Sequence, residues 1–230
     1  MQQIIQPRVL VLAPLTEVWR LLAEAFGCRY PIEPVNGLRI PCCYLRAWRV
    51  LLAPGGHGKT QCAVHAQYLA DCFASAEMLV CAGAAGSLHP DLSAGDVVVG
   101  TETVEHDYRL LFATRPLPRF PAHASSVDRL RDAARGLSGF RIAFDIIASG
   151  DEDVVSSERA AAIRTQTGAA CVAWEGSGTA RAAAFSGLDS LEVRALTDPA
   201  DKEAPQQFGA NLPTAMANIA TLLTAFFEGR

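Results

Sequence analysis

Two acidic residues, Glu175 and Asp198, each follow a run of apolar or β-branched residues in this sequence. The first ends the segment VAWE, and the second ends LEVRALTD, in which Arg194 lies four residues before the acid. Because the carboxyl ends of strands in an open α/β sheet converge on the ligand crevice, we expect these side chains to meet there. Two carboxylates and a guanidinium can grip a polyhydroxylated ligand and move a proton. The pattern predicts an enzyme that acts on a small molecule.

The rest of the chain predicts the sheet that would position these side chains. Apolar or β-branched runs predict strands over residues 8–13, 38–45, 48–53, 77–82, 95–103, 140–149, 169–173 and 190–196. Helices are predicted over residues 17–26, 60–73, 126–135, 156–168, 175–186 and 211–228. Because strands and helices alternate, the expected fold is α/β, with a central mixed but largely parallel sheet flanked by helices.

Local signals set expectations for the boundaries of several elements. Thr16 is expected to cap the first helix and Ser156 the fourth, because a side-chain oxygen satisfies free amide groups there. The last helix is expected to begin near Pro213, since proline is tolerated in a first helical turn. Residues 83–88 (GAAGSL) and the proline-rich residues 107–125 are expected to form loops.

The bulk composition excludes several classes of protein. Half of the 230 residues are hydrophobic, the net charge is −4, and the chain has no run of five like charges. Binding to nucleic acid therefore has no electrostatic support. No apolar stretch approaches the ~20 residues of a membrane span, and the N-terminus does not resemble a signal peptide. We expect one cytoplasmic domain over residues 1–230, with neither a nucleic-acid nor a membrane partner.

The cysteines carry no clear chemical signal. Seven cysteines are an odd number, and no two of them have CxxC spacing. We therefore expect neither a disulfide framework nor a zinc site, and we expect the thiols to be buried and reduced. Cys42 and Cys43 are expected to face opposite sides of a strand. No metal site is expected.

The glycine-rich segment APGGHGKT, residues 53–60, permits a different class of protein. It fits the phosphate-binding loop of nucleotide triphosphatases if alanine is allowed at its first position, and it lies between a predicted strand and helix. Lys59 would then bind phosphate together with magnesium. Such loops usually follow the first strand, however, and the strand predicted over residues 77–82 ends in Cys-Ala-Gly rather than in a magnesium-binding aspartate, although VAWE could serve instead. A tight turn before a helix is a third interpretation.

Six segments, in order along nearly the whole chain, resemble the nucleoside phosphorylase/nucleosidase family, specifically its hydrolases of 5′-methylthioadenosine and S-adenosylhomocysteine. They are LAPLTEVWRLL, GGHGK, CAGAAGSLHPDLSAGDVVV, ASGDEDVV, VAWEG and VRALTDPAD. The most specific are GDVVV and VRALTD. The resemblance implies hydrolysis of the N-glycosidic bond of a purine nucleoside, without metal or cofactor, by a homodimer.

The same resemblance implies a role for each acidic residue. Glu17 would orient and deprotonate the attacking water, and Glu175 with Arg194 would bind the ribose hydroxyls. Asp198 would hydrogen-bond to, or protonate, purine N7. These roles suit a reaction that passes through an oxocarbenium-like sugar, with an acid at the leaving group and a base at the water. Taken singly, Glu17 is also explained by the helix dipole, and Asp198 by a turn before proline.

The base and the 5′ substituent are left open by four departures from the family pattern. Asp153 and Val154 would offer backbone groups to the edge of the base, but Asp153 replaces an aromatic residue that stacks on the purine. His57 replaces an aliphatic residue at the thioalkyl tail, and Trp174 a methionine under the ribose. Ala84 replaces a serine. Nucleosides of the futalosine type are therefore alternative substrates.

The molecule that accepts the sugar distinguishes a hydrolase from a phosphorylase. Phosphorylases of the family bind phosphate through an arginine on the strand before the GSxG loop, and Cys81 stands there in this chain. Their first-strand turn carries glycine–proline–arginine, whereas this chain has Glu17. Both differences favour water as the nucleophile. A phosphate-dependent purine nucleoside phosphorylase, a P-loop nucleotide-binding protein and a non-catalytic nucleoside sensor are the competing hypotheses.

Overall fold

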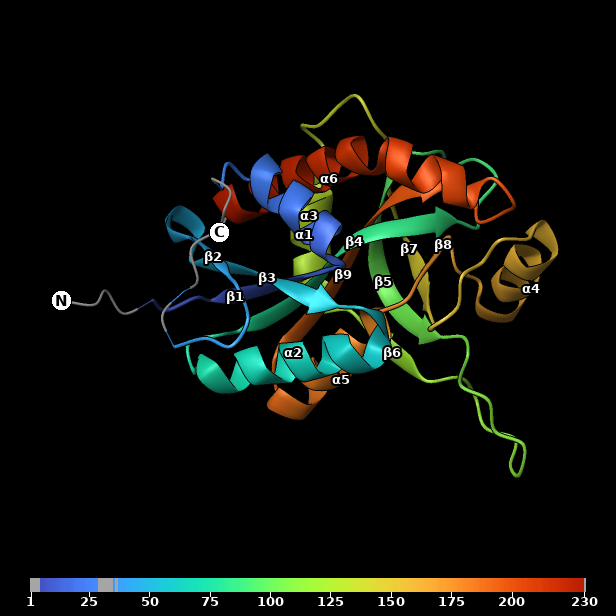
Figure 1. Ribbon diagram of the computed structural model, residues 1–230, viewed down its shortest axis with the longest axis horizontal. Coiled ribbons are helices and arrows are strands. Elements are labelled where there is room, and N and C mark those ends of the chain that lie inside the picture. The colour runs from blue at the N-terminus through green and yellow to red at the C-terminus, as the bar shows by residue number, and fades with distance from the viewer. Residues whose placement is uncertain (1–4, 29–34, 36, 230) are drawn as a thin grey trace.

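The computed structural model describes residues 5–28, 35 and 37–229 and shows a nine-stranded sheet between helical layers (Figure 1). The strands are β1 (Val9–Pro14), β2 (Cys43–Leu45), β3 (Val50–Gly56), β4 (Met78–Ser87), β5 (Val97–Glu105), β6 (Arg119–Pro121), β7 (Ile142–Ser149), β8 (Cys171–Ala173) and β9 (Asp189–Asp198). The helices are α1 (Thr16–Ala25), α2 (Gly58–Cys72), α3 (Ala124–Ala134), α4 (Ser157–Thr167), α5 (Gly176–Ser186) and α6 (Ala204–Glu228), with a 3-10 turn at Arg46–Trp48. The predicted α/β class is confirmed.

The sheet is more evenly mixed than the sequence predicts. Within the described residues, five strand pairs are parallel, namely β1–β3, β1–β4, β4–β9, β5–β7 and β7–β8. Four are antiparallel, namely β2–β3, β4–β8, β5–β6 and β5–β9. Because β9 pairs with both β4 and β5, the pairing closes a ring through β4, β8, β7, β5 and β9. The carboxyl ends of β1, β3, β4 and β9 lie at one edge, since these four strands run parallel to one another.

Two helical layers cover the sheet, on opposite faces (Figure 1). Helices α1, α3 and α6 pack on one face, where Trp19, Leu130 and Phe226 belong to the largest buried cluster. Helices α2 and α5 pack on the other face, through buried residues such as Cys62, Leu69 and Ala183. Helix α4 lies beside β7 and β8, outside these two layers (Figure 1). The strands between the layers are buried on both faces, which explains their continuous apolar runs.

Several predicted boundaries are wrong, and each has a local cause. Thr16 is the first residue of α1 and caps nothing, whereas Ser156 caps α4 by accepting a hydrogen bond from the Arg159 amide at 3.2 Å. Residues 83–87 continue β4 because β9 pairs with residues 83–86 and β8 with residues 86–87. Helix α6 begins at Ala204, with Pro205 in its first turn, so Pro213 lies inside the helix. The expected loop of residues 107–125 contains the short strand β6, which pairs with β5.

The expectation that all thiols are reduced is wrong for one pair. Cys28 and Cys43 form a disulfide, which joins the end of α1 to β2. The spacing of the two residues could not reveal this bond, because their proximity depends on how α1 packs beside β2. Of the five remaining cysteines, only Cys72 is exposed. Cys42 and Cys43 do face different apolar clusters, as the strand pattern predicts.

Helix α6 qualifies the statement that no segment approaches the length of a membrane span. Within the described residues, it is the one helix long and apolar enough to cross a membrane by length and composition. Half of its apolar window is buried in the fold. Its buried side chains, including Met216, Ile219 and Leu223, belong to the cluster beneath α1 and α3. Packing against the sheet therefore accounts for the apolar composition of α6.

Candidate active site

A cavity of about 360 Å³ lies where the carboxyl ends of several strands converge. Its walls come from the ends of β1, β3, β4 and β8, from β9, from residues 152–155 after β7 and from the first turns of α6. Eight of the nine residues that the sequence assigned to the site line it, namely His57, Ala84, Asp153, Val154, Trp174, Glu175, Arg194 and Asp198. The cavity therefore occupies the crevice expected for an α/β sheet.

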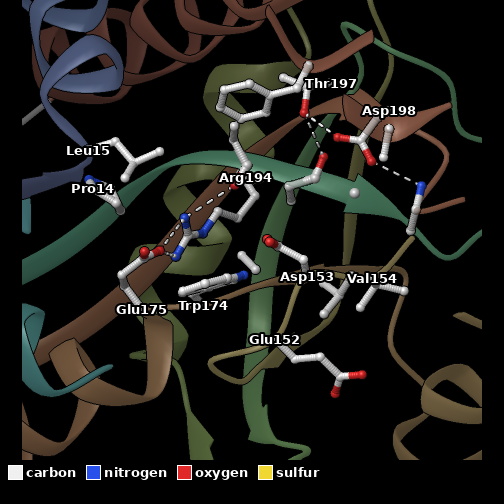
Figure 2. Close-up of a pocket in the computed structure, with 18 of the residues that line it drawn as sticks. Pro14, Leu15, Glu152, Asp153, Val154, Trp174, Glu175, Arg194, Thr197 and Asp198 are labelled. Atoms are coloured by element: carbon white, nitrogen blue, oxygen red, sulfur yellow. Dashed lines mark hydrogen bonds and ion pairs between the residues drawn. The ribbon is translucent and has the colours of Figure 1, made fainter. Parts of the chain in front are cut away.

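Asp198 ends β9 and presents a carboxyl group at one end of the cavity (Figure 2). Its Oδ2 accepts a hydrogen bond from Thr197 Oγ1 at 2.7 Å, and its Oδ1 accepts one from the Ala200 amide at 3.0 Å. Burial raises the pKa of Asp198, and these two hydrogen bonds oppose the shift. Ala200 holds its amide in place with a left-handed backbone, φ 52°. The group can thus carry a proton while it is aimed into the cavity.

Glu175 and Arg194 lie together at the other end in the same view (Figure 2). Both terminal nitrogens of the Arg194 guanidinium lie 3.4 Å from Glu175 Oε2, and Glu175 Oε1 accepts a 3.3 Å hydrogen bond from the Gly58 amide. Burial raises the pKa of Glu175, against the opposing effect of Arg194. The pair combines one acceptor and one donor group, the set that sugar hydroxyls require.

The turn that carries Glu175 is held by Ser149 at the end of β7. Ser149 Oγ donates to the Trp174 carbonyl at 2.7 Å and accepts from the Ser177 amide at 3.0 Å. Because β8 has only three residues, these bonds fix the chain where it passes from strand to α5. The sequence VAWEG therefore forms a short strand, a fixed turn and a helix start, and the turn directs Trp174 and Glu175 into the cavity.

His57 and Trp174 form a stacked pair in the cavity wall. Their ring centroids lie 4.5 Å apart, and the ring planes differ by 14°. Both are residues that depart from the family pattern, and the sequence did not predict that they contact each other. A stacked histidine and indole offer a flat, partly polar surface rather than a flexible aliphatic one.

The loop after β7 brings Asp153 and Val154 to the cavity. Figure 2 shows Asp153 between the Glu175 end and the Asp198 end. Glu152 forms two 2.6 Å hydrogen bonds with Arg159 of α4, which anchor the loop on one side. The amide of the preceding residue, Asp151, donates to Asp107 Oδ2 at 2.9 Å. The start of the loop is therefore held by α4 and by the residue pair after β5.

Glu17 is the one assigned residue that does not line the cavity. Because α1 begins at Thr16, the Glu17 side chain lies exposed on the first turn. Its neighbours Leu15 and Val18 both line the cavity. The Glu17 side chain has no hydrogen bond or ion pair with any residue that the structure describes, so it is free to change rotamer. The water-activating role of Glu17 stays a prediction.

The glycine-rich turn does not form a phosphate cradle. Lys59 Nζ contacts Glu105 at 3.0 Å and Asp107 at 2.5 Å, and its backbone amide donates to Asp151 Oδ1 at 2.8 Å. The amide groups and the lysine that would bind phosphate are thus held by carboxylates of the protein itself. This arrangement contradicts the P-loop interpretation.

One buried acid in this region escaped the sequence analysis. Glu192 of β9 accepts a 2.8 Å hydrogen bond from Arg194 Nε and is 3% exposed. The signal was a charged residue two positions before Arg194 in an otherwise apolar strand, which places both side chains on one face. Among the described residues, no group of three or more His, Cys, Asp or Glu side chains is arranged to hold a metal ion.

Comparisons with known proteins identify the family of this α/β protein. The sequence pattern that defines the phosphorylase superfamily matches residues 8–228. The 5′-methylthioadenosine/S-adenosylhomocysteine nucleosidase of Geobacillus thermodenitrificans is 30% identical over 205 residues, which cover 86% of this chain and 82% of that protein. The nucleosidase of the same name from Geobacillus kaustophilus is 29% identical over 220 residues, 92% of each chain. The chain therefore belongs to the phosphorylase superfamily.

Solved structures agree with this assignment. A 5′-methylthioadenosine/S-adenosylhomocysteine nucleosidase from Neisseria meningitidis, in complex with methylthio-immucillin-A, superimposes with a TM-score of 0.83 at 28% identity and covers 97% of this chain and 100% of its own. The futalosine hydrolase of Helicobacter pylori superimposes with a TM-score of 0.85 at 23% identity, covering 98% of this chain and 99% of its own. The second match shows the shared fold alone.

Proposed function

We propose that this protein hydrolyses the N-glycosidic bond of a purine nucleoside of the methylthioadenosine or adenosylhomocysteine type and releases the free base. The observation that carries the proposal is a protonatable Asp198 at one end of the cavity and the Glu175–Arg194 pair at the other. The names of the relatives at 28–30% identity support the same substrate class.

Asp198 supplies the acid in this proposal. When the bond between C1′ and the purine breaks, its electron pair passes to the base, which leaves readily once N7 is protonated. The raised pKa of Asp198 keeps a proton available for that step. General acid catalysis of this kind contributes about 10²–10⁴-fold. Asp153 and Val154, next to one another in the anchored loop, offer backbone groups to the edge of the base.

The sugar is held by Glu175 and Arg194, and water attacks C1′ on the side away from the base. We assign activation of this water to Glu17, because Leu15 and Val18 on either side of it line the cavity. A rotamer change of the exposed Glu17 side chain would bring its carboxylate toward the sugar. The position at which phosphorylases carry arginine is Cys81, and a hydrogen bond with Cys62 together with burial raises the pKa of that thiol, so it is neutral.

A futalosine-type nucleoside is the second candidate substrate, and one observation favours it. The stacked His57–Trp174 pair offers a flat surface, which suits a planar 5′ group better than a thioalkyl chain. The fold shared with a futalosine hydrolase is compatible with this alternative.

Base release from a panel of nucleosides tests the proposal. Methylthioadenosine, adenosylhomocysteine, adenosine, inosine and futalosine would each be incubated with and without phosphate, and the products separated by chromatography. Free base without phosphate is the expected result, and the best substrate identifies the 5′ group. Release that requires phosphate would instead make the protein a phosphorylase. If no nucleoside of the panel releases its base, a non-catalytic nucleoside sensor is favoured.

The proposed setting is a single domain that acts as a homodimer in the cytoplasm. Leu111, Phe112 and Phe185 are large apolar side chains that are 84%, 105% and 83% exposed in one chain, which supports burial against a second copy. The net charge of −4 supports a small-molecule substrate over nucleic acid. Sedimentation would measure the oligomeric state.

A further inference from the structure

Glu192 is a charged side chain inside the sheet that the proposed reaction does not use. It lies on β9 between Leu191 and Val193, both buried, and its side chain is 4% exposed. It is not among the residues that line the cavity. An ionised carboxylate at such a position is costly unless its hydrogen bonds are satisfied.

Both oxygens of the Glu192 carboxylate accept hydrogen bonds. Oε1 accepts from Arg194 Nε at 2.8 Å, and Oε2 accepts from Thr103 Oγ1 at 2.5 Å. The neighbouring position is Gly176, where a Cβ atom would overlap the Glu192 carboxylate. Gly176 thus leaves space for the Glu192 side chain, and Thr103 donates a hydrogen bond to it. Both residues support the contact between Glu192 and Arg194.

The contact determines which edge of Arg194 faces the cavity. Glu192 takes the Nε edge of the guanidinium. The two terminal nitrogens face Glu175 Oε2, each at 3.4 Å, and they also donate to the Ala84 carbonyl at 3.3 Å and to Cys81 Sγ at 3.2 Å. One positive charge therefore lies between two carboxylates. Arg194 is the only Lys or Arg among the described residues that line the cavity, and three further acids, Glu152, Asp153 and Asp198, also line it. An inorganic anion at this site would find no uncompensated positive charge.

We propose that Glu192 is a positioning residue that holds Arg194 against Glu175 and cancels its charge, so that the site accepts water and rejects phosphate as the acceptor of the sugar. This inference rests on the proposed hydrolysis. In that reaction the water oxygen bonds to C1′ as the C1′–purine bond breaks, the base receives the electron pair and the Asp198 proton, and a carboxylate takes the proton lost by water. Phosphorolysis would replace the water by a phosphate oxygen, which requires a net positive site.

Glu192→Gln is the variant that tests the charge. The glutamine carbonyl can accept from Arg194 Nε and its amide can donate to Thr103 Oγ1, so the shape and both contacts are retained. For an assumed separation of about 6 Å and an effective dielectric constant of about 20, removing one unit charge changes the affinity for an anion by about 100-fold. We expect the turnover of the native enzyme to be indifferent to phosphate at constant ionic strength. The turnover of the variant should respond to phosphate, either by inhibition or by formation of a sugar phosphate. The response should occur at phosphate concentrations about 100-fold below any at which the native enzyme responds.

Two variants serve as matched controls. Thr103→Val removes a hydrogen bond to Glu192 but leaves its charge, so phosphate indifference should persist. Glu102→Gln removes a carboxylate from β5, next to Thr103. Glu102 pairs with Arg119 away from the cavity, so this variant should behave like the native enzyme. If Glu192→Gln does not fold, Glu192→Ser also removes the charge and leaves room for water at Thr103.

The outcomes separate this inference from the proposed function. If the native enzyme releases base without phosphate and the folded Glu192→Gln variant shows the same indifference to phosphate, the role of Glu192 is refuted and hydrolysis stands. If the native enzyme releases no base unless phosphate is present, the proposed hydrolysis itself fails. A phosphate response confined to the variants that remove the charge of Glu192 would establish the inference.

Discussion

Replacing Asp198 by asparagine would remove the proton donor while preserving its surroundings. The carboxylate accepts one hydrogen bond from Thr197 Oγ1 and one from the Ala200 amide. Asparagine keeps both contacts, because its carbonyl can accept from the amide and its NH₂ group can donate to the hydroxyl. The variant therefore loses its transferable proton and little else. We expect kcat for base release to fall about 100- to 10,000-fold, the range of general acid catalysis.

The pH dependence of kcat tests most directly whether Asp198 is the acid. Burial raises the pKa of Asp198, so the acid form extends to higher pH than for an ordinary aspartate. In the native enzyme activity should fall on the alkaline side as Asp198 loses its proton, and the residual activity of Asp198→Asn should lack that decline. Base release measured from acid to alkaline pH would show both. A variant with native kcat, or with an unchanged alkaline decline, would refute Asp198 as the acid.

The stability of Asp198→Asn checks the same burial independently. Because the folded-state pKa of Asp198 is raised, its favourable contribution is present below the unfolded pKa and is lost as pH rises through the folded pKa. Asparagine does not ionise and suffers no such loss. Thermal unfolding should therefore find the variant equal to the native protein near pH 4, and equal or more stable near pH 8. A variant that is less stable only at the higher pH would show that the ionised carboxylate stabilises the fold.

Three further substitutions test other parts of the site. Glu17→Gln should lower kcat about 100-fold with little change in KM, because the water loses its proton acceptor; an unchanged kcat would transfer that role to another carboxylate. His57→Leu removes the ring stacked 4.5 Å from Trp174, and should raise the kcat/KM of methylthioadenosine relative to that of futalosine by about 10-fold. An unchanged ratio would exclude the stack as the source of specificity. Lys59→Ala removes a cation from the buried Glu105 and the partly buried Asp107, and Glu105 keeps only Arg181 as an ion-pair partner among the described residues, so urea unfolding should show a loss of about 1–2 kcal/mol, while kcat stays near native. Loss of nucleotide binding in that variant would instead revive the P-loop interpretation.

The alternation of strands and helices was predictable from the sequence, but the length of β4 was not. Gly83 and Gly86 favour a loop by propensity, since glycine weakens a strand. In the structure they continue β4, because β9 pairs with them. Glycine is needed there because a Cβ at Gly83 would lie 3.2 Å from the Arg194 guanidinium and one at Gly86 would lie 3.0 Å from Asp198 Oδ1. The glycines leave space for the functional side chains of β9. A local pattern cannot reveal a requirement that comes from a partner strand more than a hundred residues away.

The candidate site was predictable where its residues end strands, and less so elsewhere. Glu175 and Asp198 follow apolar runs, and the convergence of strand ends then brings them to one cavity. Glu17 lies on a helix, where a shift of one residue in the start of α1 decides which side chain faces the sheet. The stack of His57 on Trp174 joins residues more than a hundred positions apart, and no local spacing encodes it.

The Glu192–Arg194–Glu175 arrangement shows why the site costs the fold stability. Two carboxyl groups and a guanidinium are buried together here, and replacement of a buried ion pair by apolar side chains of similar volume is often neutral or stabilising. Selection for stability alone would favour such a replacement on β9, where the other residues from Leu191 to Leu196 are apolar. Charges kept at such a position point to function, because proteins depart from the rule of apolar cores mainly at functional sites. Glu175 and Arg194 already have a use in binding the sugar. Glu192 never reaches the cavity, and control of the charge on Arg194 is the use that its contacts provide.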